Sequence, residues 1–172
     1  MIKQEGDSSE MKTFDEFNTT RRENVEKAHS YFIPFERDDE FAFNNKIIDR
    51  TKSSLFISLD GMWNIKEHGS VDDVVIDEEL SNKVPVPSCV QMFGYDHIQY
   101  INYRYPFPFR PPFTPKENPA YHYRRDFDIE DLNYRYYLNF EGVDSFFDLF
   151  IHGKKVGYSQ ISHSTSEFDI TS

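Results

Sequence analysis

The histidines and the cysteine are the side chains of this chain whose types are best suited to nucleophilic or metal chemistry. The histidines are His29, His68, His97, His122, His152 and His163. No two of them have the spacing of four residues that puts two metal ligands on one face of a helix. Cys89 has no second cysteine with which to form a disulfide or a cysteine-based zinc site. Spacing alone therefore predicts no metal or nucleophilic site.

Carboxylates are abundant but do not form a catalytic pattern. Acidic runs at residues 72–73 and 77–79 could supply paired carboxylates, yet they read as an exposed connection between strands. Glycoside hydrolysis needs two carboxyl groups on opposite sides of one bond. The sequence also has no nucleophile elbow, phosphate-binding loop or dinucleotide-binding motif. Motifs alone thus predict no catalytic site.

Length and charge narrow the class of protein. The 172 residues are a usual size for one domain, and 19 basic against 30 acidic side chains give a net charge of −11. Such a surface repels phosphate backbones, so we expect no nucleic-acid partner. No apolar run approaches the roughly 20 residues of a membrane span, and the N-terminus does not resemble a signal peptide. We therefore expect a cytoplasmic protein without a membrane partner.

The elements that must position any site are predicted to be strands. Aromatic residues, which suit pleated and half-buried surfaces, make up 17% of the chain. The clearest strand is 121–129, where Tyr121 and Tyr123 share one face and His122 and Arg124 the other. Further strands are predicted at residues 55–59, 62–66, 134–140, 146–151 and 156–158, with turns at 60–61 and 152–154. This pattern favours an all-β sandwich or jelly roll.

The domain organisation follows from composition. Residues 1–50 are predicted to be an arm that is partly disordered or extended, and residues 51–172 the sandwich domain. Residues 84–119 hold eight of the nine prolines, interleaved with aromatic rings. Proline removes a backbone donor, so this segment is not ordinary central sheet. We expect residues 84–119 to form a long, packed loop.

Residues of this loop carry a family resemblance. Residues 86–96, VPSCVQMFGYD, resemble the segment VPSNWQMxGYD of the large β-galactosidases of glycoside hydrolase family 2. The resemblance continues in order through residues 100–106, 111–119, 123–125, 140–145, 152–160 and 166–171. It departs from the family pattern at Cys89 and Val90, where Asn-Trp is usual, and at His152, where asparagine is usual. The resemblance implies a jelly-roll β-sandwich of the galactose-binding-domain type.

The resemblance also implies an activity. Family members hydrolyse terminal non-reducing β-D-galactose residues, as in lactose, by retaining double displacement on two glutamates of a catalytic barrel. Those glutamates would lie beyond Ser172, so we expect no catalytic residue in this chain. By the same comparison the chain would be an N-terminal piece that lacks the last strands of its sandwich, and we expect it to be marginally stable alone. The implied partners are the β-galactoside, the barrel and, in the complete enzyme, further copies in a homo-oligomer.

Four residues are implied as ligands. Asn102 matches an asparagine that projects into the galactose pocket, where an amide can both donate and accept hydrogen bonds. Gln160 matches a glutamine near a magnesium site, and Asp15 and Asn18 loosely match an Asp-x-x-Asn that supplies oxygen ligands from the arm. We expect magnesium and sodium in the complete enzyme and neither ion to bind tightly to this piece.

Alternative interpretations stay open at this point. Asn102 could hydrogen-bond its own loop, and Asp15 and Asn18 could belong to a solvated arm. Trp63 is more simply a core anchor than a sugar-stacking platform. The chain could be a free-standing carbohydrate-binding or interaction module, or part of another family 2 glycosidase such as a β-glucuronidase. The QMxGYD and PPFxPxENP segments favour the galactosidase branch.

Overall fold

The structure, a computed structural model, describes residues 22–39, 43–44, 47–98, 102, 113, 115 and 117–171. Within them the regular elements are antiparallel strands and short 3-10 helices, and no helix is long and apolar enough to cross a membrane. The predicted all-β class is confirmed. The strands are β1 (Arg22–Glu23), β2 (Phe43–Asn44), β3 (Ile47–Ile48), β4 (Gly61–His68), β5 (Asn82–Val86), β6 (Ala120–Arg124), β7 (Tyr137–Phe140), β8 (Phe147–Ile151), β9 (Lys154–Ser159) and β10 (Ser166–Asp169). The 3-10 helices are η2 (Arg50–Lys52), η3 (Val71–Asp73) and η4 (Val90–Phe93).

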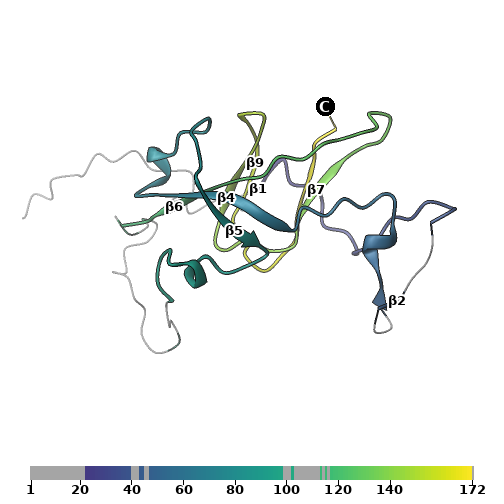
Figure 1. Ribbon diagram of the computed structural model, residues 1–172, viewed down its shortest axis with the longest axis horizontal. Helices are drawn as coiled ribbons and strands as arrows, with labels where there is room; N and C mark the ends of the chain where they lie inside the picture. The colour runs from purple at the N-terminus through teal and green to yellow at the C-terminus, as the bar shows by residue number, and fades with distance from the viewer. Residues whose placement is uncertain are drawn as a thin grey trace, which may run out of the picture.

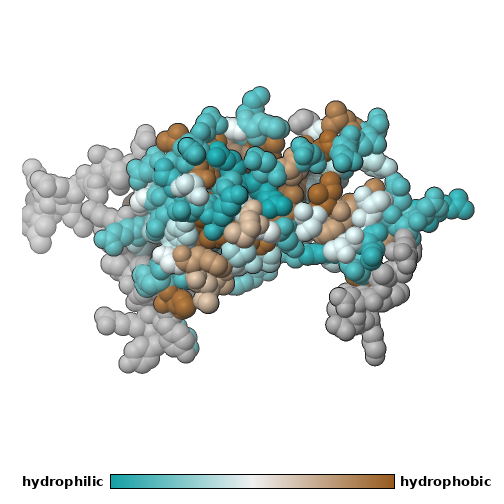
Figure 2. All heavy atoms as spheres, viewed as in Figure 1, coloured by the Kyte–Doolittle hydropathy of each residue, from teal (hydrophilic) through white to brown (hydrophobic). Residues whose placement is uncertain are grey.

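Three sheets build the body of the domain. Their strand orders are β5-β4-β6, β1-β9-β8 and β10-β7, and all neighbours are antiparallel. The β2-β3 hairpin stands apart, on the side of the molecule away from β6 (Figure 1). Figure 2 shows a mostly hydrophilic surface over β4 and β6, with apolar residues gathered nearer β7.

Aromatic side chains join the β10-β7 pair to β8. The ring centroids of Phe140 and Phe147 lie 4.8 Å apart, and Phe168 meets both edge-on at 6.1 and 6.0 Å. Phe168 has no exposed surface and Tyr158 almost none. Edge-to-face packing of this kind adds to the burial energy of each ring. The aromatic load of the sequence is thus used in part to hold the sheets together.

Glycine is required at one position of this interface. A Cβ atom at Gly157 in β9 would lie 2.4 Å from Phe168 Cε1 and 2.6 Å from the backbone oxygen of Glu23 in β1. Real Cβ atoms essentially never come so close to other heavy atoms. The absence of a side chain at residue 157 therefore lets β10 and β1 approach β9.

The turn between β8 and β9 is the tight hairpin that the sequence predicts. His152 and Gly153 both have positive φ, at 49° and 73°, and they are the two residues between Ile151 and Lys154. A two-residue turn with both φ angles positive matches the right-handed twist of the flanking strands. His152 adopts this conformation although it is not glycine.

Two predicted features near β4 are wrong. Residues 55–59 form no strand, with Leu55 and Ile57 exposed by 36% and 51%, and Gly61 begins β4 with φ of 131° instead of making a hairpin turn. The physical reason is that a strand has two edges, and β4 pairs with β5 on one and β6 on the other. The predicted strands 121–129 and 134–140 are real but shorter, since β6 ends at Arg124 and β7 begins at Tyr137.

The predicted loop over residues 84–119 is wrong at its start, because residues 84–86 belong to β5. β5 is an edge strand of its sheet, a position where the missing backbone donor of Pro85 is tolerated.

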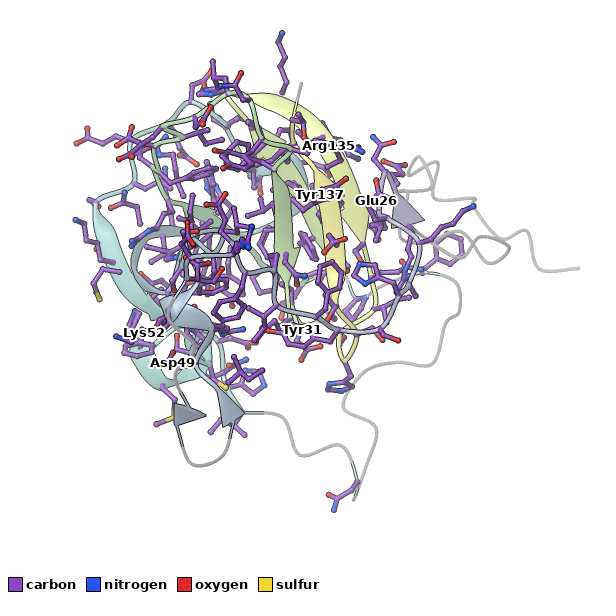
Figure 3. All side chains as sticks on the ribbon, turned by 90° about the vertical axis from the view of Figure 1, so that its right-hand side faces the viewer. Glu26, Tyr31, Asp49, Lys52, Arg135 and Tyr137 are labelled. Carbon is purple, nitrogen blue, oxygen red and sulfur yellow. The ribbon has the colours of Figure 1, made fainter. Side chains whose placement is uncertain are left out.

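Residues 22–29 run along β9 and β10. Arg22 pairs with Ser159, the Glu26 amide donates to the Glu167 carbonyl at 2.8 Å, and the His29 ring meets the Glu167 carboxylate at 2.9 Å. Figure 3 shows Glu26 on this arm beside Arg135 and Tyr137. Residues 1–21 lie outside the described part of the chain, and the division into 1–50 and 51–172 stays a prediction.

The contact between His29 and Glu167 predicts that arm docking depends on pH. The Glu167 hydrogen bond raises the pKa of His29 above its ordinary value of 6.5. Because the pKa of His29 is higher in the folded chain than in the unfolded chain, the stabilisation from this contact is complete at pH values below the unfolded-state pKa. It is lost as the pH rises through the folded-state pKa. We expect the Glu26 amide to show a higher hydrogen-exchange protection factor at a pH just below the unfolded-state pKa of His29 than at a pH above its folded-state pKa. His29→Gln should remove the difference, and equal protection factors in the unaltered chain would contradict the prediction.

Candidate functional site

The β5-β4-β6 sheet carries a row of polar side chains on one face. Lys66 of β4 lies directly opposite His122 of β6 in the strand register. Side chains alternate between the two faces of a strand, so His68 shares the face of Lys66, and Arg124 that of His122. The register thus brings together two histidines that stand 54 positions apart in the sequence.

Glu78, from the loop between η3 and β5, completes a histidine–glutamate cluster with His68 and His122. Its carboxylate oxygen Oε1 lies 2.6 Å from His68 Nε2 and 3.3 Å from His122 Nδ1. The other oxygen, Oε2, accepts a hydrogen bond from Lys66 Nζ. Arg124 donates to the Glu78 backbone carbonyl at 2.9 Å. Both the backbone and the side chain of Glu78 are therefore held against the sheet.

The cluster is well shielded from solvent. The side chains of His68, His122 and Glu78 are exposed by 7%, 11% and 12%. The hydrogen bond from Lys66, with the nearby His122 and His68 rings, lowers the pKa of Glu78 to about 2 against the opposing effect of burial. Glu78 is thus a fixed carboxylate that faces two imidazole rings.

The sequence reasoning missed this cluster. A search at helical spacing cannot find ligands that come from two neighbouring strands. The available signal is the spacing of two residues between Lys66 and His68, and between His122 and Arg124. That signal does not say which strands pair, and Glu78 lies in an acidic run that resembles a solvated loop.

Asn102, the residue implied to contact sugar, is exposed and lies in a turn. Residues 99–101 and 103–112 around it are outside the described part of the structure. The sugar-contact role of Asn102 stays a prediction.

Gln160 directly follows β9 and is partly buried. Its Oε1 accepts a hydrogen bond from the Tyr158 hydroxyl at 2.9 Å and keeps a second lone pair. Asp15 and Asn18 lie outside the described residues, but Arg22 pairs with Ser159 next to Gln160. Asn18 is four residues before Arg22, a reach of at most about 14 Å of extended chain. The magnesium-ligand roles of Gln160, Asp15 and Asn18 stay predictions.

Trp63 anchors packing at the start of β4. Its indole Nε1 donates to the Leu59 carbonyl at 2.8 Å, and its strand partner Val84 is buried. The hydrogen bond satisfies the polar edge of the ring inside the domain, which favours the core-anchor interpretation of Trp63.

Comparison with known proteins matches residues 56–172 to the family model "Glycosyl hydrolases family 2, sugar binding domain". The chain belongs to this family. The family 2 resemblance is therefore confirmed, and the matched residues include β4 to β10 and the whole histidine–glutamate cluster. The jelly-roll type of the fold is the one that the family implies.

Curated relatives of this family 2 domain carry the name "Beta-galactosidase". The protein from Actinobacillus pleuropneumoniae is 42% identical over 161 residues, which cover 92% of this chain and 16% of the relative. The protein from Staphylococcus xylosus is 39% identical over a region that covers 87% of this chain and 16% of the relative. The protein from Pseudoalteromonas haloplanktis is 40% identical over a region that covers 66% of this chain and 12% of the relative. The relatives are thus glycoside hydrolases, and this chain spans about an eighth to a sixth of their length.

Proposed function

We propose that this domain acts as part of a β-galactosidase that releases terminal non-reducing β-D-galactose from lactose-like substrates. The observation that carries the proposal is the 42% identity over 92% of the chain to a protein named β-galactosidase. Catalysis is assigned to a barrel elsewhere in the complete polypeptide, which supplies two glutamates for retaining double displacement. The complete enzyme is proposed to be a homo-oligomer.

In this proposal Asn102 contacts the galactose from the proline-rich loop. Its amide can accept a hydrogen bond from one sugar hydroxyl and donate to another. Its exposure in the isolated domain supports a role toward a ligand or a neighbouring part of the polypeptide.

Magnesium is proposed to join the arm to the sandwich through Gln160, Asp15 and Asn18. The support is the pairing of Arg22 with Ser159, the residue next to Gln160. A bound divalent ion would neutralise the Asp15 carboxylate and hold residues 15–18 near the end of β9. Sodium is proposed to bind residues in other parts of the complete polypeptide.

Substrate selectivity of the complete polypeptide tests the proposed function. We expect purified enzyme to hydrolyse a chromogenic β-galactoside with a larger kcat/KM than the matching β-glucuronide. A preference for the glucuronide would assign the chain to another activity of the family. A polypeptide that hydrolyses neither substrate but binds galactose would indicate a carbohydrate-binding module.

Asn102→Ala, made in the complete polypeptide, is expected to lower kcat/KM for a β-galactoside about 5- to 150-fold. This range corresponds to the roughly 1–3 kcal/mol lost when one partner of a buried hydrogen bond is removed. Steady-state kinetics measures the change. Asn133→Ala is a matched control, because Asn133 is an exposed loop asparagine that bonds its own loop residue Asp131. An unchanged kcat/KM for Asn102→Ala would overturn the assignment of Asn102 to the sugar site.

A further inference from the structure

We propose that His68, Glu78 and His122 form a binding site for a divalent transition metal ion of the zinc class. Each residue offers one ligand atom, and the three atoms lie within 4.8 Å of one another. The site lies on the polar face of the β5-β4-β6 sheet and uses none of the residues assigned above to sugar or magnesium. It therefore stands or falls independently of the proposed galactosidase function.

The donor atoms select the class of metal. Two imidazole nitrogens and one carboxylate oxygen are a ligand set that Zn²⁺ accepts, whereas Mg²⁺ and Ca²⁺ favour sites built from oxygen. Three protein ligands leave a further position for water. The site is thus distinct in chemistry from the proposed oxygen-only magnesium site.

A buried nitrogen in the cluster points to a bound ion. His68 Nε2 is inaccessible to solvent and makes no hydrogen bond of normal geometry among the described residues. Yet it lies 2.6 Å from Glu78 Oε1, on a side chain that is only 7% exposed. A buried polar atom without a hydrogen bond is costly, and an ion shared with Glu78 and His122 would satisfy it.

The surroundings of Glu78 orient it as a ligand. Lys66 occupies Oε2 and leaves Oε1 directed at the two histidines. Carboxylates that ligate metals are commonly held in this way by a hydrogen bond to the second oxygen. Arg124 fixes the backbone carbonyl of the same residue. The carboxylate is therefore preorganised from both sides, which reduces the ordering cost of metal binding.

A metal at this site would link β4 and β6 to the loop between β4 and β5. His68 ends β4, Glu78 belongs to the loop that leads to β5, and His122 lies within β6. Because the unfolded chain does not hold these residues together, binding stabilises the folded domain. The site would act as a clip on the loop between β4 and β5.

Zinc titration of the tag-free 172-residue chain tests the site. We expect isothermal titration calorimetry to give one Zn²⁺ per chain. At a hundredfold excess of free Zn²⁺ over Kd the melting midpoint should rise by about 5–11 °C. Chain loaded with Co²⁺ should show the visible absorption of a low-coordinate ion with nitrogen and oxygen ligands, and an equal concentration of Mg²⁺ should not displace it.

Matched variants locate the bound ion. His68→Gln and His122→Gln should each weaken Zn²⁺ binding at least about tenfold. His97→Gln should not, although His97 also lies beside a carboxylate, Asp96 at 3.1 Å, because its side chain is 80% exposed. Absence of Zn²⁺ binding, displacement by Mg²⁺, or equal loss in His97→Gln would each overturn the site and leave the cluster an ion pair only. If a cluster variant fails to fold, the Co²⁺ spectrum of the unaltered chain decides.

Discussion

Replacement of Phe168 by alanine is expected to lower the free energy of unfolding by about 3–5 kcal/mol. Phe168 has no exposed surface, and its ring packs edge-on against both Phe140 of β7 and Phe147 of β8. Truncation of a fully buried ring loses its transfer free energy and leaves a cavity that the sheets only partly close. Because whole domains are stable by about 5–15 kcal/mol, the loss is a large fraction of the total.

Equilibrium unfolding in urea measures this change for Phe168→Ala. Phe93→Ala is the matched control, since Phe93 is exposed by 45% and its truncation should change stability by about 0.5 kcal/mol or less. Phe168→Leu should lie between the two because it leaves a smaller cavity. Equal midpoints for Phe168→Ala and Phe93→Ala would show that the aromatic cluster does not join the sheets.

Gly157→Ala is expected to destabilise the domain by about 3 kcal/mol, the upper part of the range for overpacking. The added methyl group would meet Phe168 on one side and the Glu23 backbone oxygen on the other. The Phe168 ring is packed against two other rings and the oxygen belongs to a paired strand, so moving either away costs free energy. The expected fall in the melting midpoint is about 6–12 °C.

A double mutant separates steric overlap from other effects of Gly157→Ala. Phe168→Ala removes the ring atoms that the new methyl group would meet and leaves the Glu23 oxygen. The double mutant should therefore lose less stability than the sum of the two single losses. Gly69→Ala is the matched control, because Gly69, like Gly157, has no positive φ, and its Cβ would meet an Asp73 carboxylate oxygen at 3.4 Å, an ordinary van der Waals distance. Additive losses in the double mutant would contradict the proposed contact.

Local pattern predicted those parts of the fold that depend on local geometry. The alternation of Tyr121, His122 and Tyr123 correctly placed the histidine on its own face of β6, and the His152-Gly153 turn follows from a two-residue hairpin. The strand predicted over residues 55–59 is wrong, because an apolar run does not show that both edges of β4 are already paired, with β5 and β6. The strand pairing that decides this is a long-range property of the fold.

The candidate sites also depend on long-range contacts, which local sequence patterns do not show. Asn102, Asp15, Asn18 and Gln160 could be named only through family resemblance, because no spacing rule connects residues of an arm, a loop and a strand end. The histidine–glutamate cluster could not be predicted, because it needs the register of β4 against β6 and the return of Glu78 to the sheet. The pairing of Arg22 with Ser159 supplies the physical link between the arm and Gln160 that the sequence lacks.

The most direct test of the proposed function is a chimaera with the Actinobacillus pleuropneumoniae β-galactosidase. This chain replaces the 161-residue segment to which it is 42% identical, and the relative without that segment is the control. We predict that the chimaera folds and hydrolyses a chromogenic β-galactoside, that the control does not, and that Asn102→Ala lowers the chimaera's kcat/KM. A folded chimaera no more active than the control would contradict the assignment of this chain to a β-galactosidase.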